Sequence, residues 1–191
     1  MGNVNINGIG TVNAGDYDEL TINGIGTING RISCRKLTSY GFTHAEKEVD
    51  ADEVVTGGYI QFDKKIRSKT MNLKEICVFN SDIDCEEMKV SGTLTVNGEM
   101  NVGEFYVIGS YLKLKDLHAD KIVIEETIVN YVVKNEVDTI ECTSIKADIL
   151  KCKKLYARDV ILGKDCVVDY LEYSGEINID SRATVKKMVK I

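Results

Sequence analysis

Apolar and polar residues alternate with a period of two along most of this chain. Between residues 20 and 34, the positions of one parity are apolar or small. They are Leu20, Ile22, Gly26, Ile28, Ile32 and Cys34. This alternation is typical of β-strands that bury one face, whereas an amphipathic helix repeats every ~3.6 residues. The pattern predicts three short strands in this stretch, with breaks near Gly24, Gly30 and Arg35-Lys36.

The same pattern returns about every 17 residues. A motif of the form apolar-x-small-x-x-apolar begins at Ile32 and recurs at this step as far as Leu117. Reading the chain at this step gives columns of residues expected to point inward. The first is Leu20, Leu37, Val54, Met71, Met88, Phe105 and Ile122, and the second is Ile22, Ser39, Thr56, Leu73, Val90, Val107 and Ile124. The third column contains small or medium side chains, namely Cys34, Ala51, Ser68, Cys85, Val102 and Ala119.

Such repeated faces predict an all-β fold, a single-stranded parallel β-helix or β-solenoid, with three short strands per coil. Each coil would pair its backbone with the coils above and below, and the columns would fill one continuous core. About ten coils at ~4.8 Å each would form a rod roughly 50 Å long. A helical solenoid would require longer repeats with a 3.6-residue period, and this chain has neither.

Glycines recur at one corner of the repeat. They are Gly24, Gly41, Gly58, Gly92 and Gly109, with Glu75 in the same series as the exception. Lone glycines and Asn-Gly pairs are typical of tight corners because glycine adopts positive φ angles without steric cost. We therefore expect positive φ at these corners.

The repeat becomes irregular after Ile122. The motif is next found at Val132-x-Lys134-x-x-Val137, then at Leu150-x-Cys152-x-x-Leu155 and Val168-x-Tyr170-x-x-Tyr173. We interpret residues 125–149 as either a bulged coil or a seam between two stacks of one solenoid. No linker rich in proline, serine or glycine interrupts the chain, so residues 1–191 are predicted to form a single β-solenoid domain.

Composition excludes several classes of protein. The 191 residues carry a net charge of −6, which argues against nucleic acid as the main partner. Proline and tryptophan are both absent, as suits a chain of ladder-paired strands. No apolar run reaches the ~18 residues of a membrane span, and no secretory signal is visible. The expected location is therefore the cytoplasm.

The sequence offers few groups for chemistry. The six cysteines are Cys34, Cys77, Cys85, Cys142, Cys152 and Cys166, without any C-x-x-C pair. Cys34, Cys85 and Cys152 are predicted to share one inward column, so we interpret the cysteines as core residues rather than metal ligands or disulfides. His44 and His118 occupy unrelated positions of the repeat. Gly24-x-Gly26 lacks the third glycine of a dinucleotide loop.

The acidic clusters are interpreted as solvated strand faces rather than calcium sites. Lysine-rich pieces at residues 151–154 and 186–190 are likewise interpreted as solvated, with contact to an anionic surface as the alternative. We therefore predict no catalytic, cofactor-binding or metal-binding residue and no small-molecule substrate.

Two stretches, ELTINGIGTINGRISCRKL at residues 19–37 and MKVSGTLTVNGEM at residues 88–100, resemble the repeats of bactofilins, bacterial cytoskeletal proteins that form polymers. The resemblance is best over residues 4–37 and 88–105. It implies a right-handed parallel β-helix that assembles end to end into nucleotide-free filaments, often near the membrane. Self-association and contact with a membrane surface are the partners that it implies.

The ends of a solenoid raise the question of assembly independently. Each end exposes unpaired backbone groups over an open core and must be covered or joined to another subunit. The N-terminal coil carries no charge before Asp16, whereas Lys186, Lys187 and Lys190 are expected to block pairing at the other end. The predicted assembly interface is the N-terminal coil, through Val4, Asn5, Ile6 and Asn7.

The sequence therefore predicts a non-enzymatic scaffold that associates through its ends. The alternative is a β-helical surface adhesin or carbohydrate-binding module, to which the missing signal peptide is the main objection. A β-helix enzyme is the less favoured reading, because such enzymes need clustered carboxylates or basic residues and long loops that build a groove. A hexapeptide acyltransferase would require strict six-residue repeats.

Overall fold

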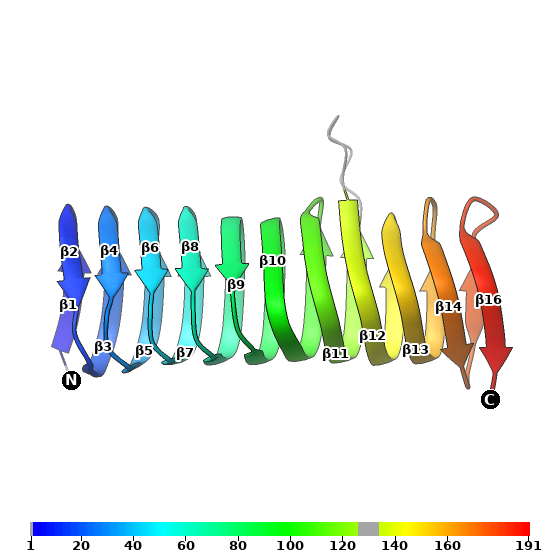
Figure 1. The fold of residues 1–191 in the computed structure, drawn as a ribbon, viewed down its shortest axis with the longest axis horizontal. Coiled ribbons are helices and arrows are strands. Elements are labelled where there is room, and N and C mark those ends of the chain that lie inside the picture. Colours follow the sequence, from blue (N-terminus) through cyan, green and yellow to red (C-terminus); the bar gives the residue numbers. More distant parts are fainter. Residues whose placement is uncertain (1, 126–133) are drawn as a thin grey trace.

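The alternating segments fold into parallel strands that stack coil upon coil. The computed structural model describes residues 2–125 and 134–191, and within them sixteen strands form one sheet in which every pairing is parallel. The strands are β1 (Gly2–Ile6), β2 (Ile9–Val12), β3 (Gly15–Ile22), β4 (Ile25–Ile28), β5 (Ile32–Ser39), β6 (Phe42–Ala45), β7 (Val49–Thr56), β8 (Tyr59–Phe62), β9 (Ile66–Phe79), β10 (Ile83–Ile108), β11 (Tyr111–Glu125), β12 (Lys134–Ala147), β13 (Leu150–Leu162), β14 (Val167–Tyr173), β15 (Ile177–Ile179) and β16 (Thr184–Lys190). The result is a β-solenoid of about 11 turns, drawn as a rod in Figure 1.

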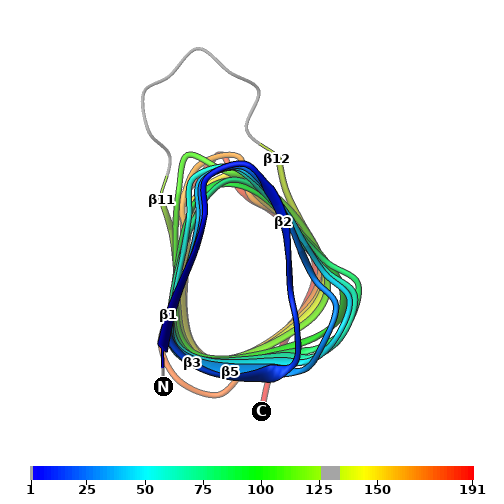
Figure 2. The same cartoon turned by 90° about the vertical axis from the view of Figure 1, so that its left-hand side faces the viewer.

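The coil is right-handed, as expected. Figure 2 looks along the rod from the N-terminal end, where β1 rises on one side and β2 descends on the other. The chain therefore turns clockwise as it recedes from the viewer. Successive strands such as β3 and β5 pair in register, with Leu20 opposite Leu37. The first two predicted inward columns are confirmed, and the Phe62 and Phe79 rings stack in a further column with centroids 4.9 Å apart.

The corner glycines are required for a reason different from the one predicted. Among the described glycines, only Gly15 and Gly109 have positive φ. The expectation of positive φ is therefore confirmed for Gly109 and was wrong for Gly24, Gly41, Gly58 and Gly92. Stacked corners instead approach so closely that a side chain has no room. A Cβ at Gly41 would lie 1.9 Å from the carbonyl oxygen of Gly24. The exception in this series, Glu75, has a φ of 61°.

The positions predicted for the motif after Ile122 were wrong. Leu117 pairs with Ile140, which pairs with Leu155, so the coils advance by 23 and then 15 residues. Cys152 pairs with Val137 and lies outside the column of Cys34, where Cys142 takes its place opposite Ala119.

A shortened corner explains the misplaced motif at Leu150-x-Cys152-x-x-Leu155. Three residues separate Ile28 from Ile32, whereas two separate Cys152 from Leu155. Shortening this corner makes it identical in spacing to the next corner, the one between Cys34 and Leu37. The sequence motif therefore matches both corners from β11 onward.

The stack continues across the predicted irregularity at residues 125–149. Residues 126–133, which include Val132 of the predicted motif, lie outside the described residues. On either side of them β11 and β12 pair directly, from Tyr111 with Lys134 to Ile124 with Ala147. Strand pairing therefore connects β1 to β16 without a break.

Candidate assembly ends and charged groove

The N-terminal end presents two open strand edges. β1 pairs with β3 and β2 pairs with β4, and among the described strands neither has a partner on its other side. Val4 and Ile6 are half-buried on the inner side, while Asn5 and Asn7 are exposed. The Asn7 side-chain oxygen accepts a hydrogen bond from Asn23 Nδ2 at 2.9 Å. The four residues predicted as an interface therefore lie together on the terminal coil.

The C-terminal end is also open but is strongly basic. β16 stacks on β14 and β15 stacks on β13, without a described strand beyond them. The lysines of β16 turn back onto the preceding coil instead of extending past the end. Lys186 pairs with Asp169 at 2.8 Å, and the Nζ of Lys187 lies 5.3 Å from the centre of the Tyr170 ring. Their positive charge remains at this edge.

A groove of about 1060 Å³ runs along one side of the rod, parallel to its axis. Its floor is the column of small residues predicted from the sequence. The floor residues are Cys34, Ala51, Ser68, Cys85, Val102 and Ala119. Charged residues of alternating sign stand on either side, as in the series Arg35, Asp52, Lys69. The sequence carries this signal, since charged residues flank the small column at every step except Val102, but we did not predict a groove.

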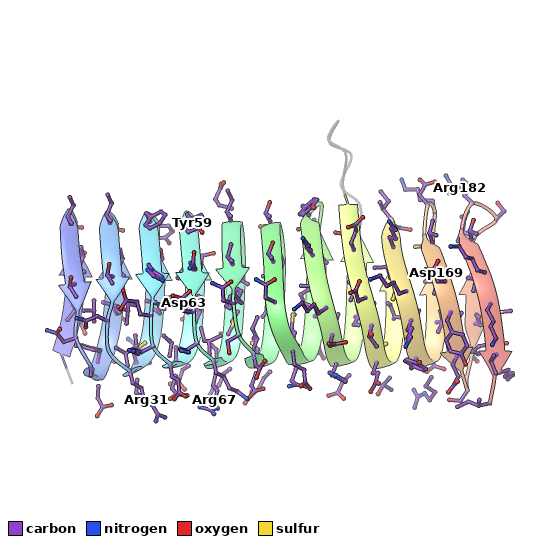
Figure 3. All side chains as sticks on the ribbon, viewed as in Figure 1. Arg31, Tyr59, Asp63, Arg67, Asp169 and Arg182 are labelled. Atoms are coloured by element: carbon purple, nitrogen blue, oxygen red, sulfur yellow. The ribbon has the colours of Figure 1, made fainter. Side chains whose placement is uncertain are left out.

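The charges of the groove largely neutralise one another. Asp50 accepts hydrogen bonds from Arg31 at 3.0 Å and from Arg67 at 3.2 Å. Both arginines are labelled along the lower edge of the rod in Figure 3. Burial opposes ionisation of Asp50, but these two hydrogen bonds outweigh it and lower the pKa of the carboxyl group. Lys69 pairs with Asp52 at 2.7 Å. Exposed ion pairs of this kind are screened by solvent, so the ladder stabilises adjacent coils only modestly.

The thiols are poor nucleophiles. All six cysteines are free, and burial raises the pKa of Cys34 to about 11 and that of Cys85 to about 12. These two thiols are therefore protonated at neutral pH, although both lie at the groove floor. The hydroxyl of Ser68 donates to the backbone carbonyls of Asp52 and Thr70 and has no neighbouring base in these contacts.

The histidines contact surface carboxylates on different sides of the rod. His44 Nε2 lies 2.6 Å from Asp63 Oδ2, and the pKa of Asp63 is lowered to about 2 by hydrogen bonds from Gln61, Asn80 and His44. His118 lies at the groove, 3.3 Å from Glu141. Within residues 2–125 and 134–191, no three His, Cys, Asp or Glu side chains come together as metal ligands would.

The lysine-rich piece at residues 151–154 is paired with the adjacent coil. Lys151 lies 3.5 Å from Glu136 and Lys153 lies 2.7 Å from Asp138. Contact of this piece with an anionic surface would have to compete with these carboxylates. None of the described residues forms a helix long and apolar enough to cross a bilayer.

Comparison of the chain with protein-family models, curated proteins and solved structures finds no match.

Proposed function

We propose that this protein is a bactofilin-like, non-enzymatic structural scaffold that assembles through the ends of its β-helix. The observation that carries the proposal is the open N-terminal coil, where β1 and β2 present unpaired edges over the half-buried Val4 and Ile6. An uncovered strand edge favours pairing with another chain. The regular fold and its repeat also support the likeness to bactofilins.

The charges at the two ends favour contact through the N-terminal coil. Residues 2–15 contain no charged side chain, so two N-terminal coils can meet without repulsion. β16 carries Lys186, Lys187 and Lys190, and two such edges would repel each other. Pairing through the N-terminal coil gives a symmetric dimer or one of the contacts of a filament.

The alternative of a carbohydrate-binding module is less well supported. Sugars stack on the exposed faces of aromatic rings, but Phe42 and Tyr59 stack on each other with centroids 4.7 Å apart and only 3° between the rings. The faces that these rings turn toward each other are covered. Negative-stain microscopy separates the two functions, because a scaffold forms filaments or paired rods and a binding module gives single particles.

The N-terminal contact is tested with Ile6→Lys. A lysine at this inward-facing position of the terminal coil places a charge on the joining surface, so the molar mass measured by light scattering should fall. The matched control is Asn13→Lys, which adds the same charge to an exposed position of the same coil. An unchanged molar mass for Ile6→Lys, or an equal decrease in molar mass for both variants, would contradict the proposal. Circular dichroism checks that each variant keeps its strands.

A further inference from the structure

One outward-facing column of the solenoid is apolar. Strand pairing places Ile9, Ile25, Phe42, Tyr59 and Ile76 in consecutive coils, and Tyr111 follows after Thr93. We name these six apolar residues the apolar stripe. Ile9 is 86% exposed, Ile25 50% and Phe42 47%. In Figure 3 the labelled Tyr59 lies toward the upper edge of the rod, on β8.

The stripe concentrates most of the exposed apolar surface. Eleven large hydrophobic residues are exposed among the described residues, and seven of them belong to the stripe or lie beside it across the glycine corner. The two beside it are Tyr40 and Ile108. The ring of Tyr40 covers Gly57, where a Cβ would lie 2.7 Å from the ring. A concentrated apolar patch on an otherwise charged surface marks an interaction site.

We propose that the apolar stripe binds the stripe of a second copy of this chain, so that two rods pair side by side and antiparallel. This contact is separate from the end contact proposed above and does not depend on it. At roughly 200 Å² for a large side chain, the seven exposed fractions amount to roughly 700 Å² per copy. A standard interface buries ~800 Å² on each partner, so the stripe together with Tyr40 and Ile108 has about the area of a stable dimer contact.

Charge and ring geometry favour a second copy over other partners. Over the first four coils the stripe is flanked by asparagine, glycine, threonine and glutamine, and His44 is the sole titratable neighbour in the adjacent outer column. A membrane-binding surface would carry lysine or arginine around its apolar residues. In the later coils Lys74, Glu75 and Lys113 lie next to the stripe. A twofold dimer uses the same patch on both partners, so an antiparallel pair sets these charged coils against the uncharged first coils of the other copy.

The distribution of charge along the rod selects the antiparallel arrangement. Tyr59 lies at the middle of the stripe, so a twofold axis there sets Ile9 opposite Tyr111 of the other copy. Only the first seven coils then overlap, and the coils beyond β11 extend past the partner. In a parallel pair all coils would lie level, and the charged Lys113, Glu136 and Lys151 of both copies would crowd the same face.

The test measures dimerisation and particle length in the Ile6→Lys background, which removes the end contact. About 11 coils at ~4.8 Å give a rod of roughly 50 Å. An antiparallel pair centred on Tyr59 spans about 15 coils, or roughly 70 Å, whereas an end-to-end pair would span roughly 100 Å. We expect small-angle scattering to give the mass of two chains and the intermediate length.

The stripe is then altered by Ile25→Thr, Phe42→Thr and Ile76→Thr together. Threonine favours strands and already occupies this column at Thr93. We expect the dissociation constant of the dimer to rise about 100-fold or more. The control, Ile161→Thr with Val167→Thr, removes exposed apolar residues elsewhere and should leave the dimer intact. A monomer before mutation, or equal dissociation in both variants, would overturn the proposal.

Cross-linking decides the direction of the rods. Tyr59→Cys should join two chains through a short bismaleimide, because this position meets itself at the twofold axis. Ile25→Cys should not, because it lies opposite Thr93 of the other copy. The native thiols stay unreactive, since burial raises the pKa of each to about 11 or 12. Cross-linking of both variants would overturn the antiparallel arrangement, and cross-linking of neither would overturn side-by-side pairing.

Discussion

Replacing Gly41 with alanine tests whether contact between stacked corners sets the spacing of the coils. The added Cβ would lie 1.9 Å from the carbonyl oxygen of Gly24 and 2.8 Å from its carbonyl carbon. Ordinary carbon–oxygen contacts are ~3.3 Å or longer, so the corners must separate by more than ~1 Å. Gly41 does not have a positive φ, so alanine can adopt its backbone conformation and the penalty is steric.

The penalty follows from the hydrogen bonds at this corner. Separation breaks the bond from Phe42 N–H to Gly24 O, now 2.8 Å, and strains the bond from Tyr40 N–H to Ile22 O, now 2.9 Å. Backbone hydrogen bonds contribute ~1 kcal/mol each, and a buried group left unpaired costs more. We expect Gly41→Ala to lower the free energy of unfolding by about 2–4 kcal/mol.

The chain supplies a matched control for this substitution. Gly8 occupies the same corner of the terminal coil, and a Cβ there would have no atom within 4 Å. Gly8→Ala should therefore change stability by less than ~0.5 kcal/mol. Urea unfolding measures both variants, and hydrogen exchange of β4 and β6 shows whether the loss is local, because solenoids unfold coil by coil. Equal stability of the two variants would refute the steric explanation.

Two further substitutions test the core and an ion pair. Phe79→Ala removes a fully buried ring stacked on Phe62, and urea unfolding should show a loss of about 3–5 kcal/mol; a loss below ~1 kcal/mol would mean that the column is not packed as described. Asp63→Asn removes a carboxylate whose pKa is about 2 in the folded protein, whereas the ordinary pKa of this group is 3.8. Because the folded pKa is depressed, this stability is present above pH ~4 and is lost as the pH falls toward 2. After allowance for partial exposure, we expect Asp63→Asn to cost about 1 kcal/mol at pH 7 and nothing near pH 2, and a loss independent of pH would contradict the role of the charge.

The sequence predicts the interior of this fold well because burial leaves a pattern. Inward positions such as Leu20, Leu37 and Val54 must all be apolar, so one coil predicts the next. The predicted register failed where two corners of the coil have the same length. From β11 onward the motif fits both, and only strand pairing shows that Cys142 and not Cys152 belongs with Cys34.

Outward positions leave a weaker pattern. Their composition is not constrained by the core, so a column such as Ile25, Phe42 and Tyr59 is hidden among polar neighbours until the register is known. The same is true of the groove, whose charges were interpreted as a solvated face. The corner glycines show a related limit, because the sequence reveals that a side chain is excluded there but not which contact excludes it.

Function in a solenoid has to be sought on its outer columns and at its ends. The inner columns are satisfied by stacking within the rod and leave no group free for a partner. What distinguishes this chain is the change in character along its axis, from an uncharged N-terminal coil and the apolar stripe to coils bearing Glu136, Lys151 and the lysines of β16. The N-terminal coils thus carry both surfaces that we propose for self-association, while the lysines of β16 lie at the other end. The proposed end contact would lengthen the rod and the proposed stripe contact would pair it sideways. One surface is the end face of the first coil and the other runs along the side of the rod, so the two do not share residues.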